Sequence, residues 1–252
     1  MSYGSILHTW TLTHSWWQLW LVSSSGFASI YFGLAFLAIL MIRFILPRVR
    51  VGEVIDQRPL YPHQIRDEIL HSLVSIAIFG LYSVLTVYLD RISWLHIHWE
   101  VNWLRLPVDL LVFGLWNEVH FYLCHRLLHT RWFYARVHKV HHKSVVPTPF
   151  STYSFHWFES ILLGSVMITG MVFYVFTIPA LILAPLESLI LNTLGHWNYD
   201  PFPEKPLENL LAASRRHSLH HGRVTGNFGF MLPYLDAWFN TEVKGPPVQT
   251  AT

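Results

Sequence analysis

Four long apolar stretches constrain the fold of this chain more than any other feature of its sequence. Residues 28–46 contain Arg43 as their only charged side chain, and residues 69–88 contain none, with His71 near their start. Each stretch is long enough to cross ~30 Å of hydrocarbon at about 1.5 Å per residue. Hydrophobic residues make up 52% of the chain and charged residues 13%, about half of the ~25% charged residues that are usual in globular domains. The sequence therefore predicts an integral membrane protein.

The other two stretches are interrupted. Residues 106–123 are apolar but include Asp109, Asn117, Glu118 and His120, and residues 161–194 contain Pro179 and Pro185. Because proline removes a helical hydrogen bond, we interpret the last stretch as a helical hairpin whose arms are each near the lower length limit for spanning. The predicted fold is an all-α membrane bundle of about four spans, the last a hairpin, in one domain that covers residues 1–252.

Charged and aromatic residues predict the orientation. Residues 1–28 contain no Lys or Arg, which argues against a cleavable signal, and their tryptophans resemble an interfacial belt. If the amino terminus is outside, every Lys and Arg, including Lys244, lies inside except Arg91 and Arg105. The lone Cys124 agrees with a reducing compartment. A net charge of +2, from basic residues that flank membrane segments, does not indicate a nucleic-acid partner.

Three histidine clusters indicate metal binding. They are His125 with His129; His138, His141 and His142; and His217, His220 and His221. On a helix, positions i, i+3 and i+4 share a face, so each cluster is expected to direct its ring nitrogens toward one point. Imidazole suits iron, zinc, copper or nickel, and eight nitrogens exceed the positions that one ion offers. We therefore expect two ions in a helical, histidine-rich cap on the cytoplasmic side.

Further motifs surround these clusters. Glu118 and Tyr122 precede His125 on the same helix, and His196-Trp-Asn198 precedes the third cluster. After that cluster come Asn227-Phe-Gly229 and Asp236-x-x-Phe239-Asn-Thr241, and the second cluster is followed by His156-Trp-Phe-Glu159.

Together these motifs resemble those of the fatty acid hydroxylase/sterol desaturase superfamily of integral-membrane di-iron oxygenases, over roughly residues 118–241. Phe228 replaces the usual Tyr, Asn240 the usual Gly, and Trp157 the Pro of an H-P-x-E element, while Arg215-Arg216 stand where a Pro is often found.

The resemblance implies roles for individual residues, within a catalytic region at about residues 105–241. It adds His196 to the eight clustered histidines as a ninth metal ligand. Glu118 either accepts the second N–H of a ligand ring and fixes its tautomer, or is a polar residue satisfied within the bundle. His120 is expected to be structural. The residues expected around the ligands are Glu118, Tyr122, His156, Asn198, Asn227 and Asp236.

The resemblance also implies a reaction. Two Fe ions, replaced by zinc in some preparations, would use O2 to hydroxylate, or less favourably desaturate, an unactivated C–H bond of a membrane lipid, fatty acyl chain, sterol or carotenoid. The sequence contains no Rossmann fingerprint, haem-attachment motif or iron–sulfur cysteine set. Electrons would therefore come from an external donor of the cytochrome b5 or ferredoxin type.

Two other classes remain open: a membrane metal transporter and a histidine-rich metal-binding membrane protein. A transporter would need polar ligands at mid-bilayer depth in more than one span.

Overall fold

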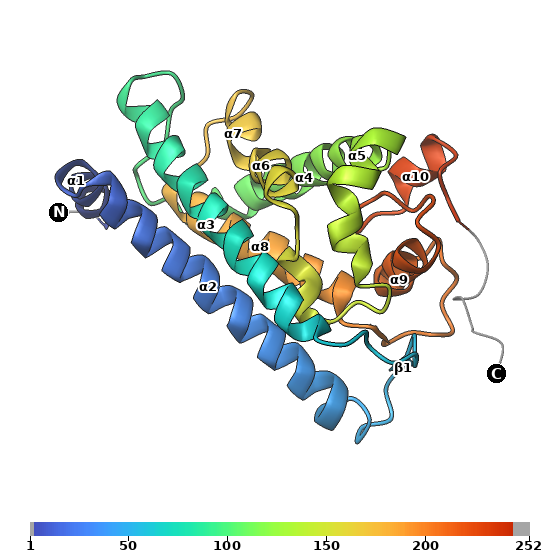
Figure 1. Ribbon diagram of the computed structural model, residues 1–252. Helices are drawn as coiled ribbons and strands as arrows, with labels where there is room; N and C mark the ends of the chain where they lie inside the picture. The colour runs from blue at the N-terminus through green and yellow to red at the C-terminus, as the bar shows by residue number, and fades with distance from the viewer. Residues whose placement is uncertain (1–2, 244–252) are drawn as a thin grey trace.

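The computed structural model describes residues 3–243, which form a bundle of helices (Figure 1). The strands within this range are β1 (Glu53–Val54) and β2 (Tyr199–Asp200), which pair antiparallel with Glu53 opposite Asp200. The predicted all-α membrane bundle is confirmed.

Two long helices form one side of the bundle. After α1 (Tyr3–Thr13), α2 (Trp16–Leu40) continues through a π-helical turn, η1 (Met41–Ile45), and α3 (Gln64–Arg91) returns beside it (Figure 1). Phe27 of α2 packs against Phe79 of α3, with ring centroids 5.9 Å apart, in a buried apolar cluster that also includes Tyr31. With α8 (Ile178–His196), these are the three helices of the described chain that are long and apolar enough to cross a membrane.

Helix α4 (Leu106–Leu128) is not among those three because of its polar residues, yet its outer face suits a bilayer. Leu111, Leu115, Val119 and Leu123 recur every four residues and are all exposed, which forms one apolar stripe. Asp109 is fully buried, and its carboxylate accepts hydrogen bonds from the Thr177 main chain and hydroxyl. Asp109, Asn117, Glu118 and His120, the polar residues within the predicted span, are all buried and therefore face the protein interior.

The stretch predicted as a helical hairpin forms two helical parts joined by a connection, but the first part packs mainly against α3 and α4 and not as a paired arm against the second. The first part consists of α6 (Trp157–Gly164) and α7 (Val166–Met171), and residues 172–177 connect it to α8. Pro179 lies in the first turn of α8, where its missing N–H costs no helical hydrogen bond, and Pro185 lies inside the same helix. The stretch is therefore interrupted just before Pro179, whereas the expectation that Pro185 also breaks it is wrong, because Pro185 lies inside a continuous helix.

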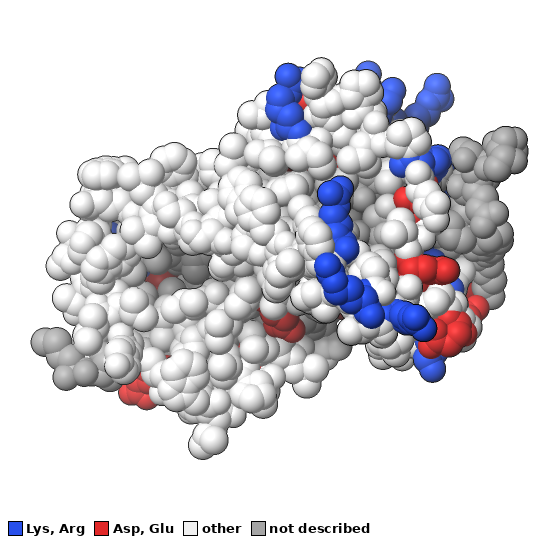
Figure 2. Space-filling view, turned by 90° about the horizontal axis from the view of Figure 1, so that it is seen from below, with Lys and Arg blue, Asp and Glu red and all other residues white. Residues whose placement is uncertain are grey.

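The remaining elements form a cap at the other end. They are α5 (Arg131–Arg136), three 3-10 turns, η2 (His138–Lys143), η3 (Pro149–Tyr153) and η4 (Leu210–Ala212), and the helices α9 (Ala213–Arg223) and α10 (Tyr234–Trp238). Lys and Arg gather toward the cap end of the face in Figure 2, whereas the opposite end is almost free of Lys and Arg. The predicted orientation, which rests on these basic residues, stays a prediction; Lys244 lies outside the described residues.

Candidate metal centre

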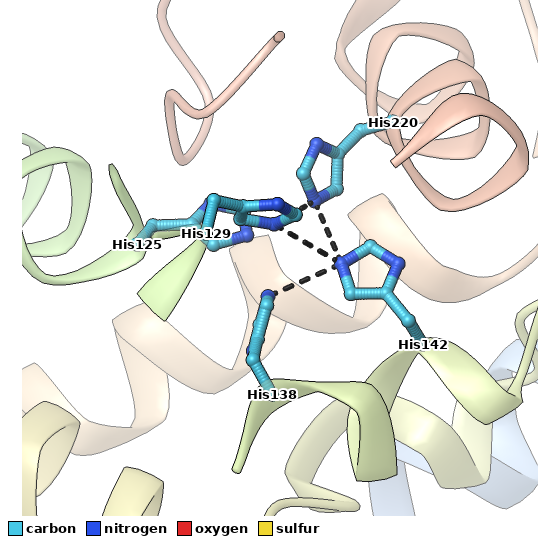
Figure 3. A group of neighbouring side chains, drawn as sticks. All are labelled: His125, His129, His138, His142 and His220. Carbon is cyan, nitrogen blue, oxygen red and sulfur yellow. Dashed lines mark hydrogen bonds between the residues drawn. The ribbon is translucent and has the colours of Figure 1, made fainter. Parts of the chain in front are cut away.

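Nine histidines meet in two groups where the cap joins the bundle. The five-histidine group contains His125, His129, His138, His142 and His220 (Figure 3), and the four-histidine group contains His141, His196, His217 and His221. Within each group the candidate ligand atoms lie within 4.8 Å of one another, and every ring except that of His129 is buried.

The second and third clusters are each divided between the two groups. His138 and His142 belong to the five-histidine group while His141 belongs to the other. On α9, His217 and His221 point to the four-histidine group, but His220 points to the five-histidine group. The expectation that each cluster converges on one point is therefore wrong. Adjacent positions such as 220 and 221 differ in direction by about 100° on a helix, and the two groups are close enough together for one helix to contribute to both.

Within each group the ring nitrogens face one another at coordination spacing. In the five-histidine group the Nε2 atom of His142 lies 3.2 Å from that of His129, 3.1 Å from that of His138 and 3.0 Å from that of His220. In the four-histidine group the corresponding contacts range from 2.9 to 3.3 Å. Metal–nitrogen bonds of about 2.0–2.1 Å place neighbouring ligand atoms about 2.8–3.4 Å apart at octahedral or tetrahedral angles. Both groups thus have the spacing of a ligand shell.

The opposite nitrogens of the rings show that the 3.3 Å contact between His141 and His196 is not an ordinary hydrogen bond, because the Nδ1 atoms of both rings face main-chain carbonyl oxygens. Most Nδ1 atoms donate to a fixed acceptor, so in the neutral ring Nε2 carries a lone pair and no proton. Lone pairs that face each other at about 3 Å repel unless a cation lies between them. The acceptors are main-chain oxygens of Phe228 for His125, Ser154 for His141, Asn192 for His196, Gly226 for His220 and Ser144 for His221, and the carboxylate of Glu159 for His138.

Burial keeps these rings neutral. Loss of solvation, reinforced by the neighbouring histidines, lowers the pKa of His125, His138, His141 and His142 well below the usual value. Neutral imidazole is the form that binds a metal ion. Two transition-metal ions held by nitrogen therefore fit the residues present.

The segment after α9 orients two of the rings. The Gly226 and Phe228 carbonyls accept hydrogen bonds from His220 and His125, at 2.7 and 2.9 Å. Asp236 holds this segment, because its carboxylate accepts from the N–H groups of Phe228 and Gly229, both at 2.8 Å. Asn227 holds it from the other side, where its Oδ1 accepts from Val243 N–H.

Backbone geometry explains two departures from the family pattern. Phe228 contributes its carbonyl oxygen, so the missing tyrosine hydroxyl does not affect this contact. Asn240 has φ 53°, a left-handed conformation that Gly adopts freely and Asn tolerates. Gly226 has φ 69°, and a Cβ there would lie 2.4 Å from the Thr241 carbonyl oxygen, so a side chain at this position would disturb the acceptor for His220.

Glu118 does not contact a ligand ring. Its carboxylate accepts from the N–H groups of Met231 and Leu232. Glu118 and His125 are seven positions apart, about 10 Å along a helix, which explains why the expected contact is wrong and the alternative, a satisfied polar residue, holds.

Three other predicted residues support the surroundings. The hydroxyl groups of Tyr122 and Thr241 lie 3.0 Å apart, Asn198 pairs with the Asp56 main chain, and His156 caps α6 by accepting from Phe158 N–H. None of these contacts reaches a ring of either group. His120 lies outside both groups, with its Nε2 3.0 Å from the Ser165 hydroxyl.

Glu159 is the functional candidate that sequence reasoning missed. It is fully buried, and its Oε1 lies 2.7 Å from His138 Nδ1. The sequence feature that could have identified Glu159 is its position at the end of the His156-Trp-Phe-Glu159 element. The main-chain acceptors give no sequence signal.

Comparison with known proteins decides the family. The model of the fatty acid hydroxylase family matches residues 110–241, just over half of the chain. The chain belongs to the fatty acid hydroxylase family. The match contains all nine histidines of the two groups.

Curated relatives of this fatty acid hydroxylase family member include sterol desaturases and aldehyde decarbonylases. It is 25% identical over 231 residues to the Delta(7)-sterol 5(6)-desaturase erg3C of Aspergillus fumigatus, which covers 77% of this chain and 69% of the relative. It is 26% identical over 195 residues to the Delta(7)-sterol 5(6)-desaturase ERG3B of Gibberella zeae, covering 71% and 56%. Against the very-long-chain aldehyde decarbonylase GL1-4 of Oryza sativa subsp. indica it is 29% identical over 147 residues, half of this chain but 22% of the relative.

No solved structure matches the chain significantly. The family and these relatives support a membrane oxidoreductase of the lipid or sterol hydroxylase or desaturase type.

Proposed function

We propose that this protein is an O2-dependent di-iron oxygenase that hydroxylates, or desaturates, an unactivated C–H bond of a membrane lipid, fatty acyl chain, sterol or similar apolar substrate. Electrons come from an external donor of the cytochrome b5 or ferredoxin type. The observation that carries the proposal is the pair of adjacent, buried histidine groups. The nine histidines are the proposed ligands, and the iron pair supplies the reduction of O2 that C–H oxidation requires.

The surroundings of the two groups support an apolar substrate. A cavity reaches His125 and His138 of one group and His141 and His196 of the other. Its other walls include Phe121, Leu128, Phe155 and Leu163. These apolar walls, which stand beside Glu159 and Asn192 in the lining, suit an apolar substrate group next to the histidines. The apolar stripe of α4 lies on the same helix as Phe121 and Leu128, which favours substrate entry from the bilayer.

The alternative of a metal transporter receives less support. The nine histidines come from α4, η2, α8 and α9, where these elements meet at the cap, and neither α2 nor α3 contributes a histidine to either group. A transport path would need such ligands at successive depths across the bilayer. The proposed orientation remains amino terminus outside and metal groups toward the cytoplasm.

Metal analysis and isotope labelling test the proposal. Protein purified without added metal should contain close to two equivalents of first-row metal. Lipid extracts of cells that express the protein under ¹⁸O2 should contain a labelled hydroxylated product, or an unlabelled desaturated one, that is missing when His142 is replaced by Ala. One metal equivalent or fewer, or identical lipid profiles, would refute the proposal.

A further inference from the structure

Helix α3 contributes no histidine to either group, but it carries a buried carboxylate that is linked to the four-histidine group by hydrogen bonds. Glu68 belongs to the second turn of α3, and its exposed fraction is 0%. The family match begins at residue 110 and does not include it. A buried carboxylate is costly unless its oxygens are hydrogen-bonded.

The donors to Glu68 identify what it holds. Its Oε1 accepts from Ser144 Oγ at 2.7 Å and from Gln64 Nε2 at 2.7 Å, and its Oε2 accepts from Thr148 Oγ1 at 2.5 Å. Gln64 also donates to the Val146 carbonyl at 2.8 Å. Two residues of α3 thus anchor both ends and the middle of residues 144–148, the segment that follows the second histidine cluster.

That segment provides the acceptor for one proposed ligand. The Ser144 carbonyl accepts from His221 Nδ1 at 3.0 Å, and His221 Nε2 lies 3.1 Å from His217 Nε2. Two consecutive contacts therefore connect the Glu68 carboxylate to the four-histidine group: Ser144 Oγ to Glu68, and His221 to the carbonyl of the same serine.

Among the described residues, no Nδ1 acceptor of a ring in the five-histidine group is held by a side chain of α3; the contact of η2 with α3 there is the surface pair of Lys143 and Asp67. The rings of this group are fixed by Phe228 for His125, by Gly226 for His220 and by Glu159 for His138. These acceptors belong to the segment after α9 and to α6. A change at Glu68 should therefore affect the two groups unequally.

We propose that Glu68 is a positioning residue for the metal ion of the four-histidine group, acting through Ser144 and His221. This inference rests on the proposed two-metal function and adds a residue from outside the family match. Removing a hydrogen-bond partner of a metal ligand typically lowers metal affinity roughly 10–100-fold. The Glu68→Ala variant should show a loss of that size at one ion only.

Cobalt titration of the metal-free full-length protein in detergent distinguishes the two ions, because four-coordinate and five-coordinate cobalt differ in their visible absorption. Wild type should bind two equivalents with both signatures. Glu68→Ala should retain the five-coordinate signature and weaken the four-coordinate one. Glu159→Gln should show the reverse pattern, because Glu159 contacts His138, and Glu53→Gln, an exposed matched change on β1, should behave as wild type.

The outcomes separate the inference from the proposed function. Fewer than two ions in wild type would refute the proposed function and the inference with it. Two ions in wild type with unchanged affinities in Glu68→Ala, or with both signatures weakened equally, would refute the inference alone. Should Glu68→Ala fail to fold, Ser144→Ala decides, since it removes the serine hydroxyl and keeps the carbonyl; weaker four-coordinate binding supports the inference and unchanged binding refutes it.

Discussion

Replacing Asp236 by Asn tests how far the segment after α9 stabilises the protein. The carboxylate is buried and accepts three hydrogen bonds: from Phe228 N–H, from Gly229 N–H, both at 2.8 Å, and from Thr241 Oγ1 at 2.7 Å. Asn has one acceptor oxygen, so its NH2 group would face one of the two main-chain N–H groups. That donor would be left without an acceptor inside the protein.

The magnitude follows from those contacts. An unsatisfied buried N–H costs about 1–3 kcal/mol, and losing the charge on the acceptor weakens each of the other two hydrogen bonds by about 1 kcal/mol. The sum is about 3–5 kcal/mol, which corresponds to a decrease in Tm of roughly 6–20 °C for a chain of this size.

Thermal unfolding in detergent, followed by tryptophan fluorescence, measures this decrease. Asp67→Asn is the matched control, because the Asp67 contacts with Arg66 and Lys143 lie at the surface and should matter little. An Asp236→Asn protein whose Tm falls by no more than that of the control would show that the carboxylate does not hold this segment.

Three further predictions concern the centre, its pH dependence and its orientation. His141→Ala should remove the ion of the four-histidine group, and His142→Ala should remove the ion of the five-histidine group. Each variant should abolish turnover, whereas His8→Ala should not. Loss of the same amount of metal from each group in both variants would contradict the division into groups. Burial lowers the pKa of His129 to about 3 and of His220 to about 4. The unfolded chain therefore binds more protons at acid pH, so the stability of the metal-free protein should fall as the pH decreases below about 6.5; denaturant titrations with no such decrease would argue against buried neutral rings. In a Cys124→Ser background, an impermeant thiol reagent on intact cells should label a cysteine placed at position 94 and spare one at 139 or 204, and the reverse pattern would invert the proposed orientation.

The sequence predicts the membrane helices because their length and composition alone decide them. It is less informative for α4, where Asp109 and Glu118 lower the hydropathy but are buried in the bundle. Their burial depends on partners such as Thr177, Met231 and Leu232, which lie far away along the chain.

Spacing and resemblance were enough to select the nine histidines, but not to divide them between the two groups. The division depends on how α9 and η2 approach each other, which the spacing of a single element does not determine. For the same reason the sequence favoured Glu118, on the helix of His125, as the carboxylate beside a ligand, whereas Glu159 approaches His138 from another helix.

The main-chain acceptors of the histidine rings have a consequence for sequence divergence. Five of the six fixed rings donate to carbonyl oxygens, which every amino acid carries. Side chains at Ser154, Asn192 and Phe228 can therefore change without removing the atom that orients the metal ligand, provided that the backbone keeps its course. A chain can thus drift to about 25% identity with its relatives and still fix its imidazole tautomers, and alignments of such proteins would reveal the ligands while leaving most of the groups that orient them undetected.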